Sequence, residues 1–107
     1  MNKEQAKLNL RKFLGGKELT FSIKQYENGE WVATCNEVPA IMTGGLGYNI
    51  TEIDSMIRDA ILTAAGIDTI YANDILKFTG YKTAEASLTS FFNLDNLVKN
   101  QAEYALS

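Results

Sequence analysis

The chain contains no histidine and only one cysteine, Cys35. Histidine is the commonest general base and the commonest ligand of transition metals, so its absence removes the usual centre of both chemistries. A lone cysteine forms neither an intrachain disulfide nor a metal site built from cysteine pairs. We therefore expect no metal, no other cofactor and no catalytic residue. We also expect a reducing, cytoplasmic setting in which Cys35 is a structural thiol.

Long apolar runs and an excess of positive charge are also missing. No apolar stretch approaches the roughly 20 residues that a membrane-spanning helix requires, and residues 1–5 are polar, unlike a secretory signal. The 10 lysine and arginine residues are outnumbered by 13 acidic residues, which gives a net charge of −3. Such a balance repels nucleic acid and favours a cationic protein partner. We expect a soluble protein that binds protein rather than nucleic acid or membrane.

The remaining composition is that of one small globular domain. The 107 residues are 46% hydrophobic and 21% charged, which leaves room for one core and predicts a single domain over residues 1–107. Residues 2–14 repeat apolar side chains at helical spacing before Gly15-Gly16, so we predict a helix within residues 1–16. Its other face carries Lys3, Lys7 and Arg11, which we interpret as a solvated helix face.

A β-hairpin is predicted next. Residues 19–26 alternate between apolar and polar side chains, and Asn28-Gly29 is typical of a two-residue hairpin turn before a return strand at 30–36. A two-residue turn pairs Tyr26 with Trp31. One face then carries Phe21, Ile23 and Val32, and the other carries Tyr26, Trp31, Ala33 and Cys35.

We predict that this second face, formed by Tyr26, Trp31, Ala33 and Cys35, is a partner interface, because aromatic side chains often dominate binding energies. Two alternatives remain open. An apolar group in the tail, Phe91, Phe92 and Leu97, folds back over the face, or a second copy of the chain covers it.

The second half of the chain adds a helix and one more strand. Residues 41–43 are predicted as a short third strand, and the glycines that follow as a loop without the Lys-Ser/Thr pair of a phosphate-binding loop. Residues 51–65 form the clearest helix, with Thr51 as its cap, Gly66 as its stop and Met56 in its apolar stripe. Residues 75–81 are predicted as a fourth strand. The tail, residues 83–107, has the spacing of interrupted helix.

Five short stretches follow one another along the chain: Gly29-Glu30-Trp31-Val32-Ala33, Glu37-Val38-Pro39-Ala40, Thr43-Gly44-Gly45, Thr51-Glu52 and Ile57-Arg58-Asp59-Ala60-Ile61. In this order they resemble HicB-type antitoxins. The match covers about residues 19–66, within a HicB-like core at 19–81. It implies a partial ribonuclease-H-like fold of three antiparallel strands, a packed helix and one further strand. It also implies the task of occluding a small basic toxin that cleaves mRNA, and frequent oligomerisation. The C-terminal part shows no evident DNA-binding segment of the kind many members carry.

An enzyme is not expected on this α+β scaffold. Metal-dependent nuclease chemistry requires carboxylates that converge from strand and helix, yet residues 19–26 contain none, and Asp54 and Asp59 are five positions apart on the helix. We expect an antitoxin-like binding protein. The alternative is a stand-alone interaction protein on the same fold, such as a phage-encoded inhibitor or a scaffold. A weaker third possibility, a nucleic-acid-binding regulator, depends on Lys3, Lys7, Arg11 and Lys12.

Overall fold

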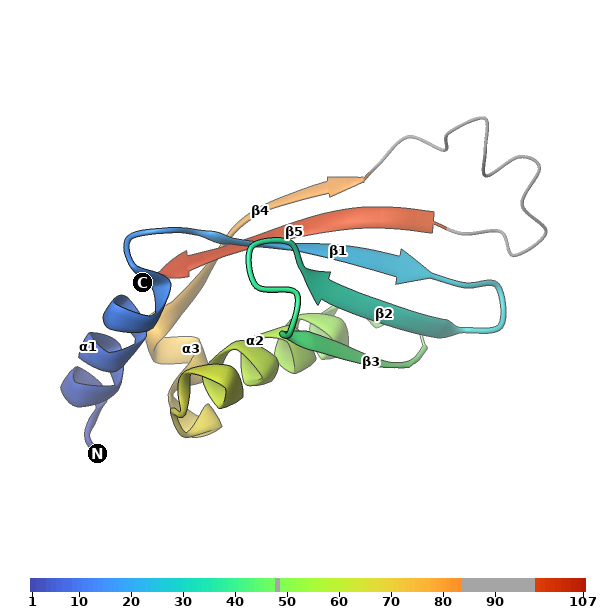
Figure 1. Ribbon diagram of the computed structural model, residues 1–107. Helices are drawn as coiled ribbons and strands as arrows, with labels where there is room; N and C mark the ends of the chain where they lie inside the picture. Colours follow the sequence, from blue (N-terminus) through green and yellow to red (C-terminus); the bar gives the residue numbers. More distant parts are fainter. Residues whose placement is uncertain (48, 84–97) are drawn as a thin grey trace.

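A computed structural model describes residues 1–47, 49–83 and 98–107. It is an α+β structure in which one five-stranded antiparallel sheet, in the order β3-β2-β1-β5-β4, carries its helices on one face (Figure 1). The elements are α1 (Lys3–Leu14), β1 (Leu19–Gln25), β2 (Glu30–Cys35), β3 (Met42–Leu46), α2 (Ile50–Ala65), the 3-10 turn η1 (Thr69–Tyr71), α3 (Ala72–Ile75), β4 (Leu76–Thr83) and β5 (Val98–Leu106).

The hairpin of β1 and β2 forms as predicted, but its register differs by one residue. The amide of Tyr26 bonds the carbonyl of Glu30, so the loop has three residues and Trp31 pairs with Gln25 rather than with Tyr26. Gly29 has a φ of 91°, as three-residue loops with a glycine bulge require. A shift of one residue moves every side chain of a strand to the other face of the sheet.

This register places the side chains of β2 opposite to the prediction. Trp31, Ala33 and Cys35 join Phe21 and Ile23 on the inner face, which α2 covers. Val32, which was expected on that inner face, lies half-buried on the outer face instead. The predicted grouping of Tyr26 with Trp31, Ala33 and Cys35 as an outer face is therefore wrong.

Helix α2 spans the inner face of the sheet much as its periodicity predicts. Its cap is Asn49, whose side chain accepts from the amides of Thr51 and Glu52, so the prediction of Thr51 as the cap is wrong by two residues. Gly66 ends the helix in the left-handed conformation. The buried side chains of the helix are Ile53, Ile57, Ile61 and Leu62. Met56, predicted in the apolar stripe, is partly exposed beside β3.

Strand β3 is longer than the predicted third strand and includes glycines that were expected to form a loop. Those glycines allow β3 to lie very close to β2. A Cβ on Gly44 would stand 2.7 Å from the carbonyl oxygen of Trp31, and one on Gly45 would stand 3.0 Å from the Trp31 indole nitrogen. Glycine therefore serves here to cover Trp31 rather than to make a flexible turn.

The C-terminal region contains the largest departure from the prediction. The fourth strand is present as β4, but residues 98–106, predicted as helix, form strand β5 between β1 and β4. Ala102 and Tyr104 of β5 are buried on the inner face, and tertiary pairing outweighs the helical spacing of these residues. The rest of the predicted tail helix, including Phe91, Phe92 and Leu97, lies outside the described residues, and so does the fold-back alternative.

Candidate functional site

The four side chains predicted as a partner interface do not form a surface. Trp31 is 2% exposed, Ala33 and Cys35 are fully buried, and Tyr26 is half-buried at the hairpin loop. A partner reaches only atoms that solvent reaches, so Trp31, Ala33 and Cys35 belong to the core of the folded chain. The surfaces open to a partner are instead the hollows and the exposed edges of the structure.

Cys35 is held in a small polar contact at the end of β2. Its sulfur accepts from the amide of Val38 at 3.4 Å and lies 3.7 Å from Oε1 of Glu37. Burial, which disfavours the thiolate, raises the pKa of Cys35 above its ordinary value. Partial burial acts to raise the pKa of Glu37, but hydrogen bonds to its carboxylate, chiefly from the Thr20 amide, together outweigh burial and lower that pKa. Cys35 thus has the surroundings of a structural thiol.

We expect Cys35 to react with iodoacetamide at least about 100-fold more slowly in the native protein than in the urea-unfolded chain, because the thiolate is the nucleophile and burial suppresses both thiolate and access. Mass spectrometry of samples quenched over time at pH 8 measures both rates. Equal rates in the two states would mean that the thiol is exposed and would contradict this structure of the β2 terminus.

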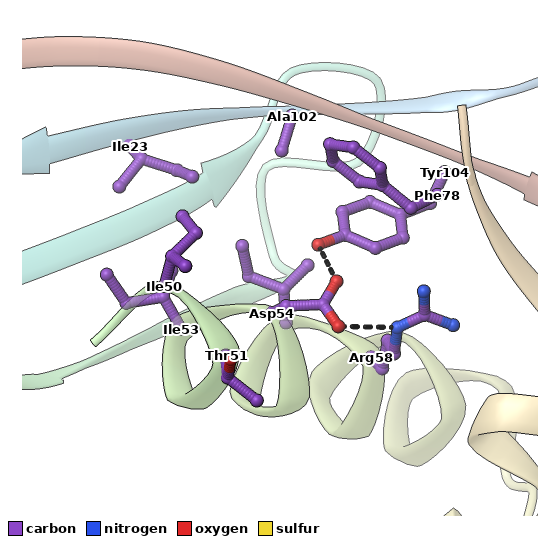
Figure 2. A pocket seen from close by; sticks show the side chains of 10 residues that line it. Ile23, Ile50, Thr51, Ile53, Asp54, Arg58, Phe78, Ala102 and Tyr104 are labelled. Carbon is purple, nitrogen blue, oxygen red and sulfur yellow. Dashed lines mark hydrogen bonds and ion pairs between the residues drawn. The ribbon is translucent and has the colours of Figure 1, made fainter. Parts of the chain in front are cut away.

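A partly open cleft separates α2 from the inner face of strands β1, β4 and β5 (Figure 2). It has a volume of about 490 Å³. Its walls are mainly aliphatic and aromatic, with three polar side chains at the end beside β4 and β5 and one near the start of α2. The lining residues are Ile23, Ile50, Thr51, Ile53, Asp54, Ile57, Arg58, Phe78, Ala102 and Tyr104.

The three polar groups beside β4 and β5 bond one another. The Tyr104 hydroxyl donates to Oδ1 of Asp54 at 2.7 Å, and Nε of Arg58 donates to Oδ2 of the same carboxylate at 2.9 Å (Figure 2). Arg58 also donates to the carbonyl of Leu76 at 2.8 Å and lies 5.5 Å from the centre of the Tyr104 ring. Burial, together with the Asp54 carboxylate, raises the pKa of Tyr104 far above its ordinary value and keeps the phenol neutral. This network ties α2 to β4 and β5.

A second hollow, the edge groove, lies where α2 runs beside β3. It has a volume of about 490 Å³, and small or apolar side chains dominate its walls. Among the groove's lining residues, Asp59 is the one that carries a charge. The lining residues are Ala40, Ile41, Met42, Thr43, Met56, Asp59, Ala60, Thr63 and Ala64.

Apolar side chains are exposed along the same edge of the molecule. Met42 is 61% exposed and Leu46 is 69% exposed. Met42 and Leu46 pair with Thr34 and Glu30 of β2, so both project from the outer face of the sheet at its β3 edge. Exposed apolar groups gathered at one edge, rather than scattered singly, are typical of an interaction surface.

The stretch of the chain that contains β3 and its neighbours in sequence has acidic residues but no basic ones. The sequence contains no lysine or arginine between Lys24 and Arg58, while that interval contains five acidic residues, Glu27, Glu30, Glu37, Glu52 and Asp54. The interval includes β2, β3 and the first half of α2. The basic residues Lys3, Lys7, Arg11 and Lys12 lie instead on α1, at one end of the molecule (Figure 1). Asp59 in the groove wall and the absence of lysine and arginine from residues 25–57 give this edge an acidic character.

The prediction from sequence missed the β3 edge because Gly44 and Gly45 were taken as a loop. The absence of lysine and arginine from residues 25–57 is visible in the sequence, and it was the feature that could have indicated this surface. Asp59 was considered only as a metal ligand. Within the described part of the chain, no cluster of three or more His, Cys, Asp or Glu side chains has the arrangement of a metal site.

Among the described residues, no helix combines the length and the apolar character needed to cross a membrane. Comparison of the chain with protein-family models, with curated proteins and with solved structures gave no match.

Proposed function

We propose that the chain is a non-catalytic binding protein of the antitoxin kind, whose partner is a small basic protein that cleaves mRNA. The observation that carries this proposal is the edge groove beside β3, with Asp59 in its wall and exposed Met42 and Leu46 at its margin. A surface with an apolar centre and charge of one sign favours a partner with complementary charge. An mRNA-cleaving partner would place this action in the cytoplasm.

The resemblance to HicB-type antitoxins supports the same proposal. We propose that β1, β2, β3 and α2 correspond to the ribonuclease-H-like unit of that family, and that β4 is the strand that follows the helix. The order of these elements along the chain agrees with that unit. Strand β5, which separates β1 from β4, is then an addition of this chain.

A binding role rather than a catalytic one is supported by how the reactive groups are used. Asp54 accepts hydrogen bonds from both Tyr104 and Arg58, so its two oxygens are already engaged in holding the fold. Cys35, the one thiol of the chain, is buried and has a raised pKa. A stand-alone inhibitor or scaffold would use the same surface, and the nature of the partner distinguishes it from an antitoxin.

The experiment that tests this function begins with affinity purification of the tagged chain from its native cells, with mass spectrometry of the bound proteins. A bound basic protein is then purified, and its cleavage of a reporter mRNA is measured with and without the chain. The proposal requires RNA cleavage by that protein alone and its suppression at equimolar chain. A bound protein without ribonuclease activity would replace the antitoxin proposal by the inhibitor or scaffold.

We expect the variant Asp59→Lys to weaken binding of the basic partner by at least about 10-fold, because it places a like charge in the wall of the edge groove. Asp74→Lys, at an exposed position of α3 away from the groove, makes the same charge change and serves as the matched control. Calorimetric titration of both variants measures the effect. Equal weakening by the two variants would assign the effect to net charge and remove the groove from the interface.

A further inference from the structure

The two edges of the sheet differ in how they are protected. Natural sheets protect their edge strands with bulges, lysines or prolines, because an open edge pairs with other chains. Strand β4 has two of these features: its pairing with β5 is irregular between Phe78 and Gly80, and its sequence includes Lys77 and Lys82. Strand β3, whose sequence is Met-Thr-Gly-Gly-Leu, has no charge and no proline, and its pairing with β2 is regular.

The backbone of β3 is arranged to accept another strand. The Cys35 amide bonds the carbonyl of Ile41, and the Gly47 amide bonds the carbonyl of Gly29, at the two ends of the β2–β3 pairing. Hydrogen bonding alternates along an antiparallel pair, so residues 43 and 45 also bond toward β2. The amides and carbonyls of Met42, Gly44 and Leu46 consequently point away from β2, toward the open edge.

Resting on the proposed function, we infer that the cationic partner binds by β-strand addition: an extended segment of the partner pairs with β3 as a further strand of the sheet. Main-chain hydrogen bonds to Met42, Gly44 and Leu46 hold the segment, and alternate side chains supply the specificity. The side chains that face α2 enter the edge groove, where Asp59 favours lysine or arginine. Those on the outer face contact Met42 and Leu46.

Charge favours this occupant over a second copy of the chain. Two copies paired through β3 would bring together two surfaces built from residues 25–57, an interval with acidic residues and no lysine or arginine. Like charges placed together across an interface cost binding energy, whereas a cationic segment gains it. The same acidic interval therefore selects the partner and opposes self-pairing.

A first experiment uses a synthetic peptide of about eight residues in which lysine alternates with valine and threonine. Amide hydrogen exchange of the full chain is followed by NMR with and without this peptide. We expect exchange of the Met42, Gly44 and Leu46 amides to slow by at least about 10-fold at saturation. A peptide with glutamate in place of lysine should leave them unchanged. Protection confined to other residues, or no binding of the lysine peptide, overturns the inference, as does protection of the three amides by self-association without peptide.

A second experiment separates backbone pairing from side-chain contact. Leu46→Ala and Leu46→Pro both remove the leucine side chain, but only proline removes the outward amide and blocks an added strand. We expect Leu46→Pro to lower affinity for the lysine peptide by at least about 10-fold relative to Leu46→Ala. The pair Met42→Pro and Met42→Ala repeats the comparison at the other end of β3, should proline at 46 disturb folding. Equal affinities within both pairs overturn the inference.

The outcomes also distinguish this inference from the proposed function. If the purified partner is an inhibited ribonuclease that binds Leu46→Pro and Met42→Pro as tightly as the alanine variants, the antitoxin function stands and strand addition fails. If the lysine peptide protects β3 but the bound cellular protein cleaves no RNA, strand addition stands and the antitoxin function fails.

Discussion

Replacing Trp31 by alanine is expected to destabilise the protein by about 3 to 5 kcal/mol, as truncation of a large buried aromatic side chain does. Trp31 is 2% exposed and lies on the inner face of the sheet, where Gly45 of β3 covers its indole. The variant loses this packing and leaves a cavity between β2, β3 and α2. Urea unfolding followed by circular dichroism measures the loss, since the tryptophan signal itself is removed.

The matched control is Val32→Ala, at the next residue on the half-buried outer face, which should cost about 1 kcal/mol or less. The comparison distinguishes the two possible registers of the hairpin. With the two-residue turn, Trp31 would be on the outer face and Val32 on the inner face, and the order of the two losses would be reversed. A stable Trp31→Ala variant that has lost its partner would restore Trp31 as an interface residue.

Replacing Asp54 by alanine should destabilise the protein by about 2 to 3 kcal/mol, because the change leaves the buried hydroxyl of Tyr104 and the guanidinium of Arg58 without their shared acceptor. The Asp54 side chain is 34% exposed, so solvent moderates the loss below that of a fully buried ion pair. Thermal and urea unfolding of the variant measure the change.

Two further variants apportion the contribution of the Asp54 network. Tyr104→Phe removes one hydrogen bond and should cost about 1 kcal/mol. In the double variant with Asp54→Ala, the two losses should be less than additive, because both act on the same bond. Asp59→Ala, a carboxylate on the same helix that faces the edge groove, should change stability by less than about 0.5 kcal/mol. A loss for Asp59→Ala equal to that for Asp54→Ala would refute the structural role of the network.

Local patterns in the sequence determined most elements of the first two thirds of the chain. Helix α1 ends at Gly15 and α2 ends at Gly66, because glycine adopts the left-handed conformation that terminates helices. The alternation of residues 19–26 predicted β1, and Asn28-Gly29 marked the hairpin. Each of these patterns depends on a few neighbouring residues, so it predicts its element without knowledge of the rest of the fold.

The surface of the candidate site required the tertiary structure. One additional residue in the hairpin loop reverses which face of β2 is buried. Side chains alternate between the two faces of a strand, so Trp31, Ala33 and Cys35 all change face together. Loop length depends on how β2 pairs with both β1 and β3, which no local pattern specifies. Most of the predicted interface residues therefore lie in the core, and the exposed edge of the sheet is β3 instead.

The sequence alone determined helix α1, the C-terminal end of α2, the presence of the hairpin, the α+β class and the acidic character of residues 25–57. Only the tertiary structure decided that residues 98–106 form a strand. These residues have apolar side chains at spacings compatible with a helix, but hydrogen bonds to β1 and β4 and burial of Ala102 and Tyr104 stabilise the extended form. Strand propensity depends on the neighbours that a segment meets, and those neighbours lie far away in the sequence.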